Sequence, residues 1–184
     1  MGVMWSGPIG PMSRERTKDF IKPRPAGGLP RFAVCEKPDT QDHKFQYTRP
    51  LPPMIGVLNF QDHSFDWKNR VVYLGLGFAD PQHQGKGYGT ELLRWALEYS
   101  FCELGIHKVA LEAYSFNQNA ANMYKKVYVR TVAVVVMAYT DGCQSKSGFT
   151  QEGRLRKTVL RGGEWHDTLI FGVSLRPSQT HSHC

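Results

Sequence analysis

The order of apolar and polar positions divides the chain into strands and helices. Runs rich in β-branched and aromatic side chains predict strands at residues 31–36, 54–60, 70–79, 107–114, 150–158 and 165–175. Leucine and other apolar residues recur at helical spacing over residues 91–104, and a second helix is predicted over residues 120–126. Gly105 stands where a first helix would end, and Gly162 with Gly163 is typical of a hairpin turn.

This order of elements predicts a mixed α/β sheet that is mostly antiparallel at its start and has a crossover helix after the third strand. Residues 37–53 and 61–69 are polar and predict a loop and a turn region. A short helix is expected to begin at Ser13. The length suits one domain, which we place at residues 13–176, with a disordered stretch at 1–12 and a flexible tail at 177–184.

The charge of the chain favours acidic ligands. Its formal net charge is +7 at pH 7, and a polyphosphate cofactor would suit such a positive field. Nucleic acid is an unlikely main partner, because the Lys and Arg residues are scattered and form no basic helix. The 4 cysteines show no metal-ligand spacing, so we expect no metal site, reduced thiols and a cytoplasmic protein. No apolar run is long enough to predict a membrane span.

The most informative motif is the glycine-rich stretch of residues 84–90, QGKGYGT, between a predicted strand and a predicted helix. Glycines let the backbone curl tightly and bring its N–H groups close to a ligand. The start of a helix adds unpaired N–H donors and a partial positive charge. The motif therefore predicts a site for a phosphate or pyrophosphate.

Two common phosphate-binding motifs do not fit this stretch. A Walker A loop needs Lys-Ser or Lys-Thr after its final glycine, whereas Tyr88 follows Gly87 and Thr90 follows Gly89. A dinucleotide fingerprint needs the spacing GxGxxG and, about 20 positions later, an acidic residue on the next strand, whereas the spacing here is GxGxG and the strand near that distance begins with His107 and Lys108. The remaining alternative from the residues alone is a glycine-rich turn without a ligand.

Residues 80–93, DPQHQGKGYGTELL, resemble the acetyl-CoA motif of the GNAT family of N-acetyltransferases, in the branch of the ribosomal-protein N-terminal and spermidine acetyltransferases. Asn117, Ala120 and Tyr124 match the N-x-x-A-x-x-x-Y segment of that branch. The resemblance continues at residues 66–70, 148–149, 152–156 and 165–167, and covers roughly residues 32–175. It implies the acyl-CoA N-acyltransferase fold, a mixed, mostly antiparallel central sheet with flanking helices.

The resemblance also implies which residues bind acetyl-CoA. The N–H groups of residues 84–90 would hold the pyrophosphate, and residues 77–79 would offer backbone groups to the pantetheine arm. Asn117 would bond the pantetheine, or would merely start the turn into its helix. The implied cofactor-binding residues are Gly77, Phe78, Ala79, Gln84, Gly85, Lys86, Gly87, Tyr88, Gly89, Thr90, Asn117 and Ala120.

The implied reaction is direct attack of a neutral amine on the thioester, with Tyr124 as the proton donor to the departing thiolate. A tyrosine that only packs in the core is the alternative. The branch commonly has a Glu where this chain has Tyr73, so the general base stays open among Glu112, His63 and His166. The acceptor could be a protein N-terminus, a polyamine or another small amine. A catalytically impaired acyl-CoA-binding domain is the alternative function, and a nucleic-acid-binding module is a weaker one.

Residues 127–147 form an atypical apolar insertion where the family pattern runs directly into Gly148 and Phe149. Codons for residues 127–129, 140–141 and 147 can carry the donor, branch-point and acceptor signals of a fungal intron, so we expect a translated intron. A genuine extra hairpin is the alternative, and transcripts that always keep the segment would support it. The resemblance also implies a shortened N-terminus, because the family usually has a strand and a substrate-side helix before Ser13.

Overall fold

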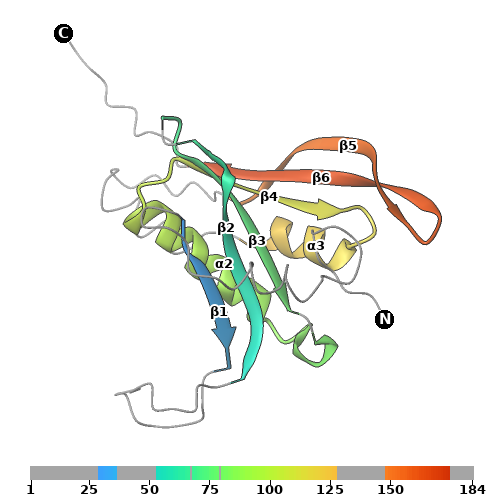
Figure 1. The fold of residues 1–184 in the computed structure, drawn as a ribbon, viewed down its shortest axis with the longest axis horizontal. Coiled ribbons are helices and arrows are strands. Elements are labelled where there is room, and N and C mark those ends of the chain that lie inside the picture. Colours follow the sequence, from blue (N-terminus) through green and yellow to red (C-terminus); the bar gives the residue numbers. More distant parts are fainter. Residues whose placement is uncertain (1–28, 37–52, 67, 79, 128–147, 175–184) are drawn as a thin grey trace.

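A computed structural model describes residues 29–36, 53–66, 68–78, 80–127 and 148–174, without the side chains of residues 62–66. Figure 1 shows one sheet with helices packed against it. The strands are β1 (Arg31–Cys35), β2 (Met54–Asp66), β3 (Val71–Phe78), β4 (Lys108–Tyr114), β5 (Thr150–Arg161) and β6 (Glu164–Ser174). The helical segments are η1 (Pro81–His83), α2 (Tyr88–Glu98), η2 (Tyr99–Glu103) and α3 (Gln118–Lys126).

The sheet has the strand order β1-β2-β3-β4-β6-β5. Only β3 and β4 pair in parallel among these strands, and the other neighbours are antiparallel. A parallel pair needs a crossover, which α2 and η2 supply between β3 and β4. The expected mixed, mostly antiparallel α/β fold and its order of elements are therefore confirmed.

The parallel pair is short. Val71–Leu74 of β3 pair with Lys108–Leu111 of β4, although β3 continues to Phe78 and β4 to Tyr114. Past this register the two strands diverge toward their C-terminal ends, and α3 is seen beside the opening in Figure 1. The sheet is thus split at the edge where parallel strands end, the place where ligands bind in open α/β sheets.

The hydrophobic core lies on one face of the sheet. Phe60, Leu74, Leu111 and Phe171 follow one another across the registers of neighbouring strands, and all are buried. Because strand side chains alternate between faces, these residues point to the same side. That side is covered by apolar residues of both helices, namely Leu93, Ala96 and Leu97 of α2 and Ala121 and Tyr124 of α3.

The predicted turn region at residues 61–69 is wrong in part, because β2 continues to Asp66. The ladder with β3 shifts register between Gln61 and Asp66, and Asp66 then pairs with Val71. Ladder bonds are made by the backbone, so a polar stretch can extend a strand once its partner strand is in place. The polarity of residues 61–66 therefore misled the prediction.

The first predicted helix differs at both ends. It begins at Tyr88 rather than at residue 91, since Gly87 takes a φ of 90° and turns the chain into the helix. It changes to a π-turn over Tyr99–Glu103, where the buried Ser100 Oγ donates to the Ala96 carbonyl at 2.6 Å. Such back-bonding competes with the helical ladder and bends helices. Gly105 ends the segment with a φ of 60°, as predicted.

Several predictions lie outside the described residues. These are the Ser13 helix, the disordered start at 1–12, most of the insertion at 127–147 and the tail at 177–184. The intron hypothesis therefore stays a prediction, although Val127 itself is described and is buried at the C-terminal end of α3. In the described part of the chain, Cys35 and Cys102 are free thiols, and no helix has the length and apolarity of a bilayer span.

Two leucines test the position of the core. Leu111 is 1% exposed, whereas Leu160 on β5 is 50% exposed. We expect Leu111→Ala to lower the free energy of unfolding by about 2–5 kcal/mol, because it leaves a cavity in the core. Leu160→Ala should change it by less than about 0.5 kcal/mol. Urea denaturation of both variants checks this, and equal losses would contradict the assigned face.

Candidate active site

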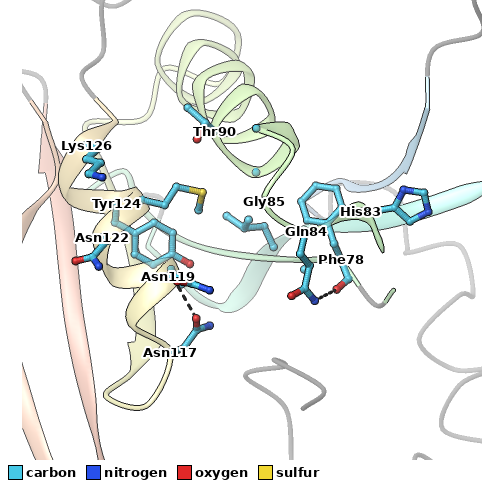
Figure 2. A pocket seen from close by; sticks show the side chains of 16 residues that line it. Phe78, His83, Gln84, Gly85, Thr90, Asn117, Asn119, Asn122, Tyr124 and Lys126 are labelled. Atoms are coloured by element: carbon cyan, nitrogen blue, oxygen red, sulfur yellow. Dashed lines mark hydrogen bonds between the residues drawn. The ribbon is translucent and has the colours of Figure 1, made fainter. Parts of the chain in front are cut away.

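A cavity of about 570 Å³ lies where β3 and β4 diverge. Its size is within the range of ligand pockets, roughly 300–1,000 Å³. Its wall comes from the end of β3, the glycine loop, the first turn of α2 and one side of α3, and Figure 2 shows these parts around a common space. The predicted residues that line it are Gly77, Phe78, Gln84, Gly85, Gly87, Gly89, Thr90, Asn117, Ala120 and Tyr124.

The glycine loop turns sharply into the N-terminus of α2. Gly85 and Gly87 have φ values of 74° and 90°, in the region that side chains disfavour. Asp80 holds the start of the loop, since its carboxylate accepts the Gln82 N–H at 2.9 Å and so caps η1. The loop and the first turn of α2 thus border the cavity, so the positive end of the α2 dipole lies at the cavity wall. The N–H groups of Gln84 and Thr90 already donate to the carbonyls of Pro81 and Gly87, and the remaining N–H groups of the loop suit an anion.

Contacts across the cavity keep its wall compact. A Cβ at Gly89 would lie 2.9 Å from the Met123 sulfur, so a side chain at position 89 would displace the flexible Met123 side chain. The Gln84 side-chain amide donates to the Phe78 carbonyl at 3.2 Å, which ties the loop to the end of β3 (Figure 2). The glycine at position 89 therefore has a packing reason as well as its predicted ligand role.

Asn117 begins α3 and faces the cavity. Its side-chain oxygen accepts the Ala120 N–H at 3.1 Å, which is an N-cap bond (Figure 2). The sequence left open whether Asn117 starts the helix or bonds the pantetheine. The structure shows that its oxygen caps the helix, while its NH₂ group can still donate to a ligand in the cavity.

Tyr124 is buried and lines the same cavity. It is 5% exposed, and its ring contacts the rings of Phe149 and Phe171. Burial disfavours the phenolate and raises the pKa of Tyr124 to about 12. Its hydroxyl therefore stays protonated at neutral pH. Core packing and proton donation, the two alternatives from the sequence, are both compatible with this position.

Two predicted site residues do not line the cavity, and a third lies outside the described residues. Lys86 is exposed and does not line the cavity, and Ala79 lies outside the described residues. Tyr88 also does not line the cavity, and its hydroxyl donates to the Glu36 carboxylate just after β1. That hydrogen bond is the main reason why the pKa of Tyr88 is raised. The predicted cofactor roles of these three residues stay predictions.

Several residues that line the cavity were not predicted from the sequence. They are Leu76, His83, Asn119, Asn122, Met123 and Lys126. Asn119, Asn122 and Lys126 recur every three or four positions, so they share one side of α3. That spacing of the three residues from one another was the signal that could have grouped them on one side of the helix.

The structure describes the side chains of two of the three candidate bases, Glu112 and His166. Glu112 in β4 is exposed, and it pairs with Ile170 between the core positions Leu111 and Ala113. It therefore points to the face of the sheet that α2 and α3 leave open. His166 in β6 is half-buried and contacts the Phe116 ring at 5.0 Å. The side chain of His63 lies outside the described set, so the choice among the three stays open.

Comparison with known proteins identifies the class. Residues 30–128 match the model of the Acetyltransferase (GNAT) family, and the chain therefore belongs to this family. The chain is 26% identical over 152 residues to the SPbeta prophage-derived uncharacterized N-acetyltransferase YokL of Bacillus subtilis, covering 83% of this chain and 72% of that protein. It is 30% identical over 129 residues to the spermidine N(1)-acetyltransferase of Vibrio cholerae, covering 70% and 61%.

Solved structures show the same fold. A chimera of the Vibrio cholerae spermidine N-acetyltransferase SpeG with hSSAT has a TM-score of 0.55 at 23% identity, over 78% of this chain and 66% of that one. A dodecameric structure of the Vibrio cholerae enzyme has a TM-score of 0.52 at 24% identity, over 67% and 58%. This chain thus spans about three fifths to three quarters of the relatives named here.

The chemistry of the described side chains gives no sign of a metal centre. One neighbouring structure of the Vibrio cholerae enzyme is a complex with manganese ions. In the described part of this chain, no group of three His, Cys, Asp or Glu side chains is placed to hold a metal ion. The polar side chains that line the cavity are amides, the Tyr124 phenol, the Thr90 hydroxyl, the His83 imidazole and the Lys126 ammonium, with no carboxylate or thiol among them, and this set suits an organic anion better than a metal.

Two glycines test the geometry of the loop. Gly87 has a φ of 90° at the N-cap of α2, whereas a Cβ at Gly153 would only touch Ile170 at 3.5 Å. We expect Gly87→Ala to cost about 1–2 kcal/mol of stability, because a side chain disfavours this backbone conformation. Gly153→Ala should cost less than about 0.5 kcal/mol. Thermal unfolding of the two variants checks the difference, and an unchanged Gly87→Ala protein would contradict the loop geometry.

Proposed function

We propose that the cavity binds acetyl-CoA and that the protein transfers the acetyl group to an amine. The observation that carries this proposal is that the anion-binding loop, the split between β3 and β4 and the buried Tyr124 all border one cavity. The loop would take the pyrophosphate, and the split would admit the pantetheine arm. Family membership supports the same ligand, since GNAT proteins use acetyl-CoA.

The split in the sheet suits an extended ligand arm. The register of β3 with β4 ends at Leu74 and Leu111, so the facing edge of Gly75–Phe78 is not paired with β4. An extended chain can add to such an edge and bond its N–H and C=O groups, as an extra strand would. The amide groups of a pantetheine arm have the right chemistry for this. Asn117 can donate its NH₂ group from the opposite wall.

Tyr124 is suited to hold the proton that the leaving thiolate needs. Acetyl-CoA supplies a thioester whose acetyl group can pass to an amine, with release of a thiol. A donor must stay protonated at working pH and must border the reacting sulfur. A tyrosine hydroxyl with its ordinary pKa is already protonated at neutral pH, and burial raises the pKa of Tyr124 further, to about 12, so Tyr124 meets the first condition. Its place in the cavity wall is compatible with the second condition.

The acceptor follows less directly from the relatives. Two of the proteins named above act on spermidine according to their names, and YokL is uncharacterized. An amine is the acceptor class we propose, which includes a protein N-terminus, a polyamine and other small amines. The open face of the sheet at Glu112 offers the amine an approach from the side opposite to α2 and α3.

The role of Tyr124 can be tested by removing one oxygen atom. We expect Tyr124→Phe to lower kcat by about 100-fold or more with any acceptor that the wild type acetylates, because a general acid contributes roughly 10²–10⁴-fold. The Kd for CoA should stay within about twofold of wild type. Steady-state release of CoA and calorimetric titration with CoA measure the two quantities.

The matched control is Tyr99→Phe, because Tyr99 packs among Phe32, Phe60 and Trp95 away from the cavity. Full activity in Tyr124→Phe would remove that residue from the chemistry. CoA binding without turnover of any amine by the wild type would favour the alternative, a catalytically impaired acyl-CoA-binding domain. Absence of CoA binding at millimolar concentration would exclude both.

A further inference from the structure

The β5–β6 hairpin reaches beyond the end of β4 and is bent on its way. Figure 1 shows the hairpin running past the C-terminal end of β4. The pairing of β5 with β6 shifts register between Leu155 and Val159, and Lys157 has a left-handed φ of 52°. A bulge of this kind increases the local twist and redirects the strand. The bulge in β5 therefore sets the direction of the hairpin tip.

Asp167 holds this bend and fixes it to the end of β4. Its carboxylate accepts the Lys157 N–H at 2.8 Å and pairs with the Arg154 guanidinium. Its backbone N–H donates to the Ser115 hydroxyl at 3.1 Å, and its carbonyl accepts the Ser115 N–H at 2.8 Å. Ser115 precedes Asn117, which borders the cavity, so the hairpin is anchored next to the cavity wall.

Arg161 reaches across this junction onto Phe116. The carbon at the centre of its guanidinium lies 4.3 Å from the ring centroid, and His166 contacts the same ring edge-on at 5.0 Å. A stacked guanidinium is weakly hydrated and loses little freedom when its edge binds a carboxylate. Within the described part of the chain, no ion pair or hydrogen bond engages Arg161, and its cross-strand partner Glu164 is exposed.

We propose that Arg161, stacked on Phe116 and flanked by His166, binds a carboxylate of the amine acceptor. The site selects amines that carry negative charge close to the reacting nitrogen, such as protein N-termini followed by acidic residues. This proposal rests on the proposed function. Its acceptor differs from the one in the name of the Vibrio cholerae relative, the polycation spermidine. A polyamine would place its positive charge beside an arginine that no described carboxylate neutralises.

The test measures binding to the protein saturated with CoA, so it does not depend on turnover. The probes are two hexapeptides, each with a free amino terminus and a fluorophore at the C-terminus. One has two acidic residues after the first position, the other has two lysines there, and the rest of the sequence is the same. We expect the acidic peptide to bind about tenfold or more tightly, the effect of one charge-assisted bidentate contact. Fluorescence polarisation gives both Kd values, and spermidine is added as a competitor.

Variants at position 161 distinguish this contact from the effect of the protein's overall positive charge. Arg161→Ala should weaken binding of the acidic peptide about tenfold and leave the lysine peptide unchanged. Arg161→Glu should reverse the preference and let spermidine compete. The matched control is Arg156→Ala, since Arg156 is an exposed arginine of the same strand. It removes the same charge from the hairpin but should keep the preference.

The proposal is overturned if the wild type binds neither peptide or shows no preference. It is also overturned if Arg161→Ala keeps the preference, or if Arg156→Ala abolishes it equally. CoA titration of each variant separates the two proposals. Loss of the peptide preference with normal CoA binding contradicts only the acceptor subsite. Absence of CoA binding in the wild type contradicts the proposed function itself.

Discussion

β3 and β4 stop pairing after Leu74 and Leu111, and the backbone groups that face the opening beyond this point need another partner. Leaving such groups buried without one costs free energy. The divergence opens a cavity that is lined by the end of β3, the start of α2 and the side of α3. The glycine loop and Tyr124 become parts of one site only because the sheet opens here.

The core keeps this opening in place from one side. Leu111 and Phe171 lie in neighbouring strands under the two helices, and Tyr124 packs its ring on Phe171 while bordering the cavity. The same side chain thus belongs to the core and to the candidate site. Gly89 couples the helices in a similar way, because its missing side chain lets Met123 approach. Stability and ligand geometry are therefore linked at these residues.

The features that local chemistry determines could be predicted from the sequence. Alternation in β4 and leucine spacing in α2 gave the core face, and the glycines before α2 gave the sharp turn into that helix. Features that depend on distant partners could not. The extension of β2 to Asp66 needs β3 beside it, and the π-turn at Ser100 depends on a hydroxyl bonding Ala96. The stacking of Arg161 on Phe116 depends on the bulge that Asp167 holds, and no spacing of residues in the sequence indicates this stacking.

The most direct test of the account is to map CoA on the protein by backbone amide chemical shifts. If the cavity at the split is the cofactor site, CoA will shift the amides of residues 84–90 and the side-chain amide of Asn117. Amides on the open face, such as that of Glu112, will move much less. Shifts confined to the open face, or an unchanged glycine loop at saturating CoA, would contradict the central claim.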